Sequence, residues 1–258
     1  MKRVYFLSPV LCLLIILFSH IQLLALDKDR VYKIAVDINY PPFSSIDEKT
    51  GRLVGFDVEI AKAVCKTIGI QCEVLAVSFD QIIPMVLRGD ADVGCAGFGF
   101  TPEREKILLF TDKYYRTNSI FVQSDLDLVE INPQLIKGKT VAVQRGTIHE
   151  EYLRTNFPDI INILLCNTFG EVMDAVKNKR ADLGFADGIP TYTYLKTEAG
   201  RSLDIAGDPI FIKDDDCLMI LHRDAVELRD SINLAIKELR STGEYDLINL
   251  KYFDYNIY

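Results

Sequence analysis

Hydrophobic and polar positions alternate along the chain in short blocks typical of strands and helices. Residues 31–37 (V-Y-K-I-A-V-D) form a β-rich run that ends in a turn-prone loop at 39–42. Between Gly55 and Gly69 the apolar residues recur on one helical stripe, which Gly69 ends. The following elements are predicted to be a strand over 72–77, a helix over 80–87 and a strand over 91–96. This alternation predicts a mainly parallel sheet with helices on both faces.

The same order of elements restarts after Gly138, which predicts a second lobe. Its elements are predicted to be a strand over 140–143, a helix over 147–157, a strand over 160–165 and a helix over 168–178. The run R-G-D-A-D-V-G-C-A-G ending at Gly97 also parallels N-K-R-A-D-L-G-F-A-D ending at Asp187, although so short a repeat also arises by chance. Ligands of open α/β sheets bind beyond the carboxyl ends of the strands, where both residues are expected.

A late apolar run at 217–221 and a helix over 224–242, which Gly243 ends, suggest that the chain returns to the first lobe. A chain that passes between the two lobes twice forms a hinge, and a cleft between lobes is a common binding place for a small ligand. We therefore expect an α/β protein of two Rossmann-like lobes joined by a two-strand hinge. The expected boundaries are 1–25 for an export signal, 30–117 and 218–258 for the first lobe, and 118–217 for the second.

The N-terminus has the pattern of an export signal. Lys2 and Arg3 precede an uncharged apolar run over 4–26, and Ala25 offers a small residue before a cleavage site. The run is also long enough to cross a bilayer, so an uncleaved anchor is the alternative, and lipid attachment at Cys12 is a weaker one. In each case the remainder of the chain is expected outside the inner membrane, in the periplasm.

Charge argues against a nucleic-acid partner. The 258 residues carry a net charge of -8, and the sequence has no basic cluster that could hold a phosphate backbone. Zinc is disfavoured because the cysteine spacing is too long for a knuckle and because His149 and His222 stand alone in the sequence. No metal and no cofactor are expected.

Removal of the signal leaves five cysteines, an odd number. In an oxidising compartment Cys65 and Cys72 are the natural disulfide pair, because one lies at the end of a predicted helix and the other at the start of a strand. The alternative is a pair of reduced, buried side chains. The other three, interpreted as core residues, are Cys95, Cys166 and Cys217.

Arg104 is the first candidate for contact with a ligand. Thr101 and Pro102 form a typical helix start, which places this cation near a helix N-terminus, where it opposes the helix dipole. A carboxylate bound there removes the conflict, because the guanidinium grips it with two hydrogen bonds and backbone N–H groups add more. The alternative is a surface salt bridge to Glu103 or Asp112.

The second lobe supplies two further candidates. Asp187 ends the predicted buried strand over 183–186, where its carboxylate could pair with an ammonium group or, alternatively, cap the helix that starts near Pro190. The turn 144–147, Q-R-G-T, joins a strand to a helix, so its N–H groups and the Thr147 hydroxyl could receive a carboxylate. An ordinary βα turn explains the same residues equally well.

Three residues are expected on the rim of the first lobe. Asp37 and Tyr40 follow the first strand, and Phe79 follows a later apolar run. Two aromatic rings could sandwich a flat or long side chain, and Asp37 could attract its cationic end. Together, a cation, an anion and aromatic rings at strand ends are complementary to a zwitterion with a side chain.

Several motifs in order resemble the polar amino-acid family of periplasmic solute-binding proteins, particularly those for arginine, histidine, lysine and glutamine. The matching runs are Y-P-P-F-S-S at 40–45, L-V-G-F-D-V-E-I-A-K-A-V-C-K at 53–66, A-G-x-x-x-T-P-E-R-E-K from Ala96, F-T-D-K-Y-Y from Phe110, K-G-K-T-V-A-V-Q-R-G-T from Lys137 and K-Y-F-D near the C-terminus. The resemblance implies the type II periplasmic binding protein fold. It also implies a disulfide between Cys65 and Cys72.

The resemblance assigns a role to the residues that are expected to contact the carboxylate and ammonium groups of the ligand. The arginine of T-x-x-R binds the ligand carboxylate in such proteins, which gives Arg104 that role, and the aspartate closing the second ligand strand, Asp187, binds the ammonium. The x-G-T turn adds Thr147 and the backbones of Gly146 and Ile148.

Side-chain preference is implied by further positions. Gln144 faces the ligand side chain in the arginine binders, and Asp37, Tyr40 and Phe79 match rim positions used there. This chain departs from its relatives at two positions beside Gly97: Gly99 replaces Ser, Thr or Asp, and Ala96 replaces a serine.

We therefore expect a monomeric, non-enzymatic protein that binds a free amino acid and delivers it to the permease of an ABC importer in the inner membrane. A basic amino acid is expected, arginine first and then lysine or histidine, with glutamine as the alternative ligand. The alternative functions are an exported cyclohexadienyl- or arogenate-dehydratase-like enzyme, for which Asp37 is the candidate acid, and a stand-alone amino-acid sensor.

Overall fold

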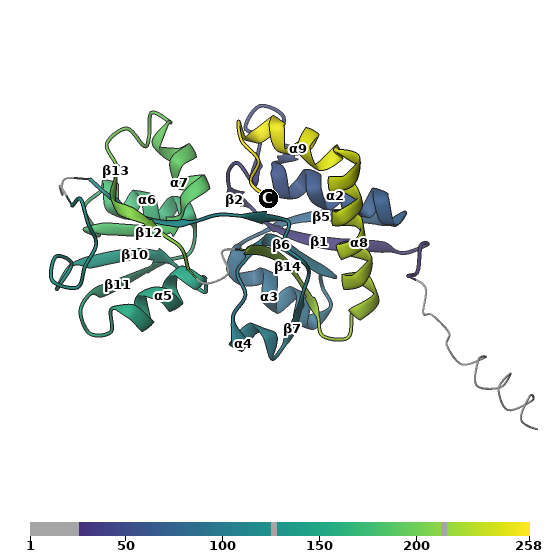
Figure 1. The fold of residues 1–258 in the computed structure, drawn as a ribbon, viewed down its shortest axis with the longest axis horizontal. Coiled ribbons are helices and arrows are strands. Elements are labelled where there is room, and N and C mark those ends of the chain that lie inside the picture. The colour runs from purple at the N-terminus through teal and green to yellow at the C-terminus, as the bar shows by residue number, and fades with distance from the viewer. Residues whose placement is uncertain (1–25, 125–127, 213–215) are drawn as a thin grey trace, which may run out of the picture.

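A computed structural model describes residues 26–124, 128–212 and 216–258, and these form two lobes that each contain one main sheet (Figure 1). The expected signal at 1–25, with Cys12, lies outside the described residues. Within the described ranges no helix combines the length and the hydrophobicity needed to span a membrane.

The first lobe is built on a six-stranded sheet whose main order is β5-β1-β6-β14-β7, with β8 paired to β14. β1 pairs in parallel with β5 and β6, whereas β14 runs antiparallel to its neighbours. The strands are β1 (Val31–Asp37), β5 (Gln71–Val77), β6 (Val93–Phe98), β7 (Leu108–Phe110), β8 (Tyr115–Arg116) and β14 (Asp216–His222). The small sheet β2-β3-β4 comprises β2 (Asn39–Tyr40), β3 (Ser44–Ile46) and β4 (Leu53–Val54).

Helices cover this first sheet. Gly69 ends α2 as predicted, since it adopts a left-handed φ of 76° that favours glycine, and α2 packs against α8. The helices are α2 (Phe56–Ile68), α3 (Phe79–Arg88), α4 (Pro102–Glu105), α8 (Val226–Thr242) and α9 (Glu244–Tyr252).

The second lobe has a five-stranded sheet in the order β11-β10-β12-β9-β13. Its elements are β9 (Ser119–Gln123), β10 (Thr140–Gln144), α5 (Ile148–Asn156), β11 (Asn162–Cys166), α6 (Phe169–Lys177), β12 (Leu183–Asp187), α7 (Gly188–Leu195) and β13 (Asp204–Ile210). β10 is parallel to β11 and β12, and β9 is antiparallel to β12.

The chain passes between the two sheets twice, from β8 to β9 and from β13 to β14 (Figure 1). The expected α/β fold with two lobes is confirmed. The mainly parallel arrangement holds for three strands of each sheet only, because the strands that follow a crossing, β9 and β14, pair antiparallel with β12 and β6. β14 begins at Asp216, two residues before the expected start of the return segment at 218.

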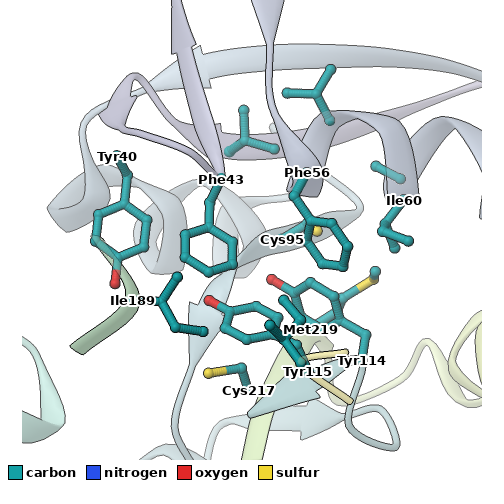
Figure 2. Close-up of a cluster of buried hydrophobic side chains, with 14 of the residues drawn as sticks. Tyr40, Phe43, Phe56, Ile60, Cys95, Tyr114, Tyr115, Ile189, Cys217 and Met219 are labelled. Carbon is teal, nitrogen blue, oxygen red and sulfur yellow. The ribbon is translucent and has the colours of Figure 1, made fainter. Parts of the chain in front are cut away.

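Buried aromatic side chains cluster in the first lobe, among them Phe43, Tyr114 and Tyr115 (Figure 2). Phe43 stacks on Tyr115 with ring centroids 4.5 Å apart, and the Tyr114 hydroxyl donates to Asp57 at 3.0 Å while accepting the Gly97 N–H at 2.9 Å. Gly97 has a φ of +59°, and a Cβ there meets the Tyr115 hydroxyl at 2.1 Å. The core therefore fixes the backbone of Gly97 and requires glycine there.

Cys65 and Cys72 are free thiols in the structure rather than the expected disulfide. The two thiols are close enough to interact, and the neighbouring Cys65 thiol lowers the pKa of Cys72 to about 7. Forming the bond requires oxidation, so the pairing stays a prediction for an oxidising compartment. The cysteines predicted to be core residues are buried: Cys95, Cys166 and Cys217.

Candidate functional site

One cavity between the two lobes collects eleven of the twelve candidate ligand residues. It encloses about 690 Å³ of empty space, part of which is open to solvent. The eleven are Asp37, Tyr40, Phe79, Ala96, Gly97, Gly99, Arg104, Gln144, Thr147, Ile148 and Asp187. The twelfth, Gly146, does not line the cavity but contacts one of its residues.

Arg104 reaches the cavity from the short helix α4. The helix starts as predicted, with the Thr101 hydroxyl accepting the Arg104 N–H at 3.1 Å. The guanidinium is buried and donates from Nη1 to the Gly99 carbonyl and from Nη2 to the Gly146 carbonyl, each at 2.7 Å. Because Gly146 belongs to the second lobe, this side chain joins the two lobes.

Within the described part of the chain no carboxylate pairs directly with this buried cation, and Glu151 acts on it only from a greater distance. Among the described residues no carboxylate oxygen lies within 4.0 Å of the Arg104 guanidinium, so the alternative of a salt bridge to Glu103 or Asp112 is wrong. Burial lowers the pKa of Arg104 to about 10. A buried guanidinium paired only with carbonyl groups is a strong receptor for an anion.

Asp187 enters the cavity from the opposite lobe, at the end of β12. It occupies the N-cap position of α7, but its side chain makes no capping hydrogen bond. Instead Oδ2 accepts a hydrogen bond from the Tyr40 hydroxyl of the first lobe, and Oδ1 lies 3.6 Å from His149 Nε2. Burial raises the pKa of Asp187, while His149 and Tyr40 oppose that shift. The capping alternative therefore does not account for this carboxylate.

Asp37 places a second acid in the cavity, at the carboxyl end of β1. The residue is 2% exposed, and burial raises the pKa of its carboxyl group. The Asn39 N–H donates to Oδ1 at 3.2 Å, and together with the nearby Gln144 side chain of the second lobe, whose amide donates to the Asn167 carbonyl at 3.2 Å, it opposes the rise in pKa. No cation lies within 4.0 Å of Asp37 among the described residues.

The turn before α5 is internally hydrogen-bonded. The Thr147 hydroxyl donates to the Gln144 carbonyl at 2.8 Å and accepts the Glu150 N–H at 3.3 Å. The Gly146 N–H donates to Glu150 Oε2 at 2.8 Å. In this arrangement the Thr147 hydroxyl and the Gly146 N–H form hydrogen bonds that start α5, as the alternative of an ordinary βα turn predicts.

Ile148 and Gly99 meet across the cavity. A Cβ on Gly99 lies 2.8 Å from Ile148 Cγ2, closer than side-chain carbons pack. The absence of a side chain at Gly99 thus lets the second lobe approach the first. The two rim aromatics contact other rings rather than each other: Tyr40 lies edge-on to Phe169 at 6.0 Å, and Phe79 stacks on Phe98 at 4.9 Å.

Sequence reasoning missed several lining residues. Sequence reasoning considers His149 only as a metal ligand, for which it lacks a partner, yet the residue follows the Q-R-G-T-I segment directly and lies in the first turn of α5. Ser119 belongs to the crossing strand β9, which was not predicted. Further lining residues from unassigned positions are Thr117, Phe169, Val172, Phe185, Ala186, Asp216 and Cys217.

Comparison with known proteins identifies relatives across nearly the whole described chain. The profile of bacterial extracellular solute-binding proteins, family 3, matches residues 32–255. The putative ABC transporter arginine-binding protein 2 of Escherichia coli (strain K12) is 32% identical over 224 residues, which are 86% of this chain and 90% of that protein. The histidine-binding periplasmic protein of the same organism is 30% identical over 233 residues, 88% of each chain.

Solved structures agree with this relationship. An ancestral arginine-binding protein bound to arginine has a TM-score of 0.81 and 30% identity, covering 88% of this chain and 100% of that chain. An ancestral arginine-binding protein bound to glutamine has a TM-score of 0.79 and 29% identity, covering 87% of this chain and 98% of that chain.

Proposed function

The chain belongs to family 3 of the bacterial extracellular solute-binding proteins, and from this membership we propose that it binds one free basic amino acid, arginine before lysine or histidine. It acts in the periplasm and delivers the ligand to the permease of an ABC importer, a role supported by its similarity to an ABC transporter arginine-binding protein and to a histidine-binding periplasmic protein. It works as a monomer by binding, with no chemistry of its own. One observation carries the proposal: the buried cation Arg104, the buried acid Asp37 and the partly buried acid Asp187, which come from two lobes, line the same cavity.

The main chain of the ligand is held by opposite charges from the two lobes. The ligand carboxylate replaces the Gly99 and Gly146 carbonyls at the Arg104 guanidinium, which supplies two parallel donors. The ligand ammonium docks on Asp187, whose carboxylate has acceptor capacity beyond the bond from Tyr40. Both ends of a zwitterion are thereby bound.

The charge balance of the cavity selects a basic side chain. Asp37 and Asp187 supply two carboxylates against one guanidinium, Arg104. The remaining acid of the lining, Asp216, is already paired, with Arg116 Nε at 2.5 Å and Lys113 Nζ at 3.7 Å. A basic amino acid carries two positive groups and one negative group, so each buried charge obtains a partner.

Glutamine is the second candidate, because an ancestral arginine-binding protein has been solved with glutamine bound. Its side chain is neutral, and it leaves Asp37 buried without a cation. Burial already raises the pKa of this carboxyl group, so glutamine binding requires Asp37 to be protonated or to stay uncompensated. We therefore rank glutamine below arginine.

Closure follows from the division of contacts between the lobes. Arg104 and Asp37 belong to the first lobe, whereas Asp187 and Gln144 belong to the second. Only the closed form makes both sets of contacts, so the ligand shifts the population toward closure. In the structure the lobes already touch through Tyr40 with Asp187 and through Arg104 with Gly146.

Calorimetric titration of the purified protein with the twenty common amino acids tests the proposal. We expect arginine to bind most tightly, lysine or histidine next and glutamine weakly. No measurable binding of any basic amino acid refutes the proposed ligand class. Turnover of prephenate or arogenate by the same preparation instead supports the enzymatic alternative.

A further inference from the structure

His149 lies between the two charged ends of the site but has no assigned part in it. The residue is 4% exposed and lines the cavity from the first turn of α5. Its Nε2 is buried without a hydrogen-bond partner, 3.6 Å from Asp187 Oδ1. Its ring lies edge-on to Phe185, with centroids 5.3 Å apart. A buried nitrogen that lacks a partner is costly, so its position calls for a functional reason.

We infer that His149 is a positioning residue for the ligand ammonium group: its Nε2–H donates to Asp187 Oδ1 once the ligand draws that carboxylate into place. The inference rests on the proposed function and deepens it. The gap of 3.6 Å exceeds a normal hydrogen bond by a few tenths of an ångström, which a small rotation of the carboxylate closes. The Tyr40 hydroxyl holds Oδ2 of the same group.

Two neutral donors suit this carboxylate better than a cation does. Tyr40 and His149 each take one lone pair of Asp187, which leaves the others for the ammonium group. A lysine or arginine at position 149 also stabilises the carboxylate, but its charge repels the ligand ammonium. The site thus requires a neutral N–H donor at this position, which an imidazole supplies as long as it stays neutral.

The surroundings of His149 keep it neutral near pH 7. Burial lowers its pKa, Arg104 on α4 lowers it further, and Asp187 at the end of β12 opposes both. On its own helix Glu151 acts on Arg104 rather than on the imidazole. From β2 the Tyr40 hydroxyl faces the same carboxylate.

The sign of the pH dependence follows from the ligand. A bound ammonium group adds positive charge beside His149 and lowers its pKa in the complex below that in the free protein. The free protein therefore holds more protons, binding releases them, and affinity rises with pH. Affinity is complete above the pKa of the free protein and falls as His149 becomes protonated.

Two matched substitutions separate the Nε2 donor from the ring. His149→Gln places an amide N–H near the Nε2 position but cannot titrate, whereas His149→Asn leaves that position empty. His222→Gln is the control, because His222 is half exposed at the end of β14. Circular dichroism and thermal unfolding establish that each variant is folded.

Titration calorimetry with L-arginine between about pH 4.5 and pH 8 is the test, because the pKa of His149 is lowered from its ordinary value and the window must extend below it. We expect wild type and His222→Gln to lose affinity toward acid pH, and His149→Gln to bind within a few-fold of wild type at pH 7.5 with a flatter profile. His149→Asn should bind about ten- to a hundredfold more weakly at pH 7.5, the effect of losing a hydrogen bond to a charged group. That loss should vanish for 5-guanidinopentanoate, which is arginine without its α-amino group.

Three results overturn the inference: identical pH profiles for wild type and His149→Gln, undiminished affinity of His149→Asn, or equal losses for L-arginine and 5-guanidinopentanoate. If His149→Asn fails to fold, the profile of His149→Gln against wild type decides alone. If wild type binds no basic amino acid, the proposed function fails first and this inference falls with it. Intact arginine binding combined with unchanged profiles refutes the role of His149 only.

Discussion

Replacing Asp37 with asparagine removes the charge that selects a basic side chain and keeps the shape of the residue. Asp37 is 2% exposed, accepts a hydrogen bond from the Asn39 N–H, and has no cationic partner among the described residues. In the proposed complex, bound arginine places its guanidinium there. The variant therefore leaves that guanidinium buried opposite a neutral amide, while Arg104 and Asp187 still hold the main chain.

The magnitude follows from breaking a buried ion pair by removal of one partner, which costs about 3–5 kcal/mol. The amide oxygen of asparagine still accepts one hydrogen bond, so we take the lower part of that range, which corresponds to about a hundredfold in the dissociation constant. L-citrulline has the length of arginine with a neutral ureido group. Its affinity should stay the same or improve, because no buried carboxylate remains to be desolvated.

The assay is calorimetric titration of wild type, Asp37→Asn and Asp254→Asn with L-arginine and L-citrulline at pH 7.5. Asp254 is exposed, so its variant carries the same change in net charge outside the cavity. We expect the ratio of arginine to citrulline affinity to fall only in Asp37→Asn. Equal arginine affinity in all three proteins refutes the reasoning on side-chain charge.

Three further outcomes follow from the same geometry. Arg104→Met should weaken the binding of every amino acid by about three orders of magnitude in calorimetry, because a buried charge pair loses its cation. The variant should still bind agmatine as wild type does, because agmatine has no carboxylate, and an equal loss for agmatine contradicts the assigned role. Gly99→Ala places a Cβ 2.8 Å from Ile148 Cγ2 and should obstruct closure of the lobes, which weakens arginine binding about tenfold. Adding Ile148→Ala to the same chain should restore both arginine binding and the ligand-induced compaction measured by X-ray scattering. Failure to restore them argues against this contact. Thr101→Ala removes the cap of α4 and should lower the free energy of unfolding in urea by about 1 kcal/mol; an unchanged value shows that the cap is not needed.

Local patterns were sufficient to predict the elements that carry the site. The helix stripe that Gly69 ends and the Thr101 cap are intrinsic to short stretches of sequence, and the structure contains both. Strand ends place Asp37 and Asp187 at the cavity because β1 and β12 each end at these residues. Motifs of this kind need no knowledge of distant contacts.

Other elements depend on contacts that the sequence does not display. β13 (D-I-A-G-D-P-I) contains glycine and proline, which are disfavoured in strands. Its antiparallel pairing with β9 stabilises the strand despite this low propensity. α9 has little amphipathic character, since Leu247 and Leu250 are exposed while Tyr245 is buried. Such elements are stabilised by their neighbours in space.

His149 shows the same limit within the site. A histidine without a metal-binding partner in sequence is usually a core residue, and this one is indeed buried. Its position beside Asp187 arises only when β12 and α5 pack together in the second lobe. The Arg104 contact with Gly146 likewise requires the two lobes to meet.

A crystal structure of the protein with L-arginine tests the central claim most directly. The account predicts that the ligand carboxylate accepts hydrogen bonds from the Arg104 guanidinium and that its ammonium group contacts Asp187, with the ligand guanidinium at Asp37. A ligand that lies elsewhere, or an Arg104 that still donates only to the Gly99 and Gly146 carbonyls with arginine bound, contradicts it.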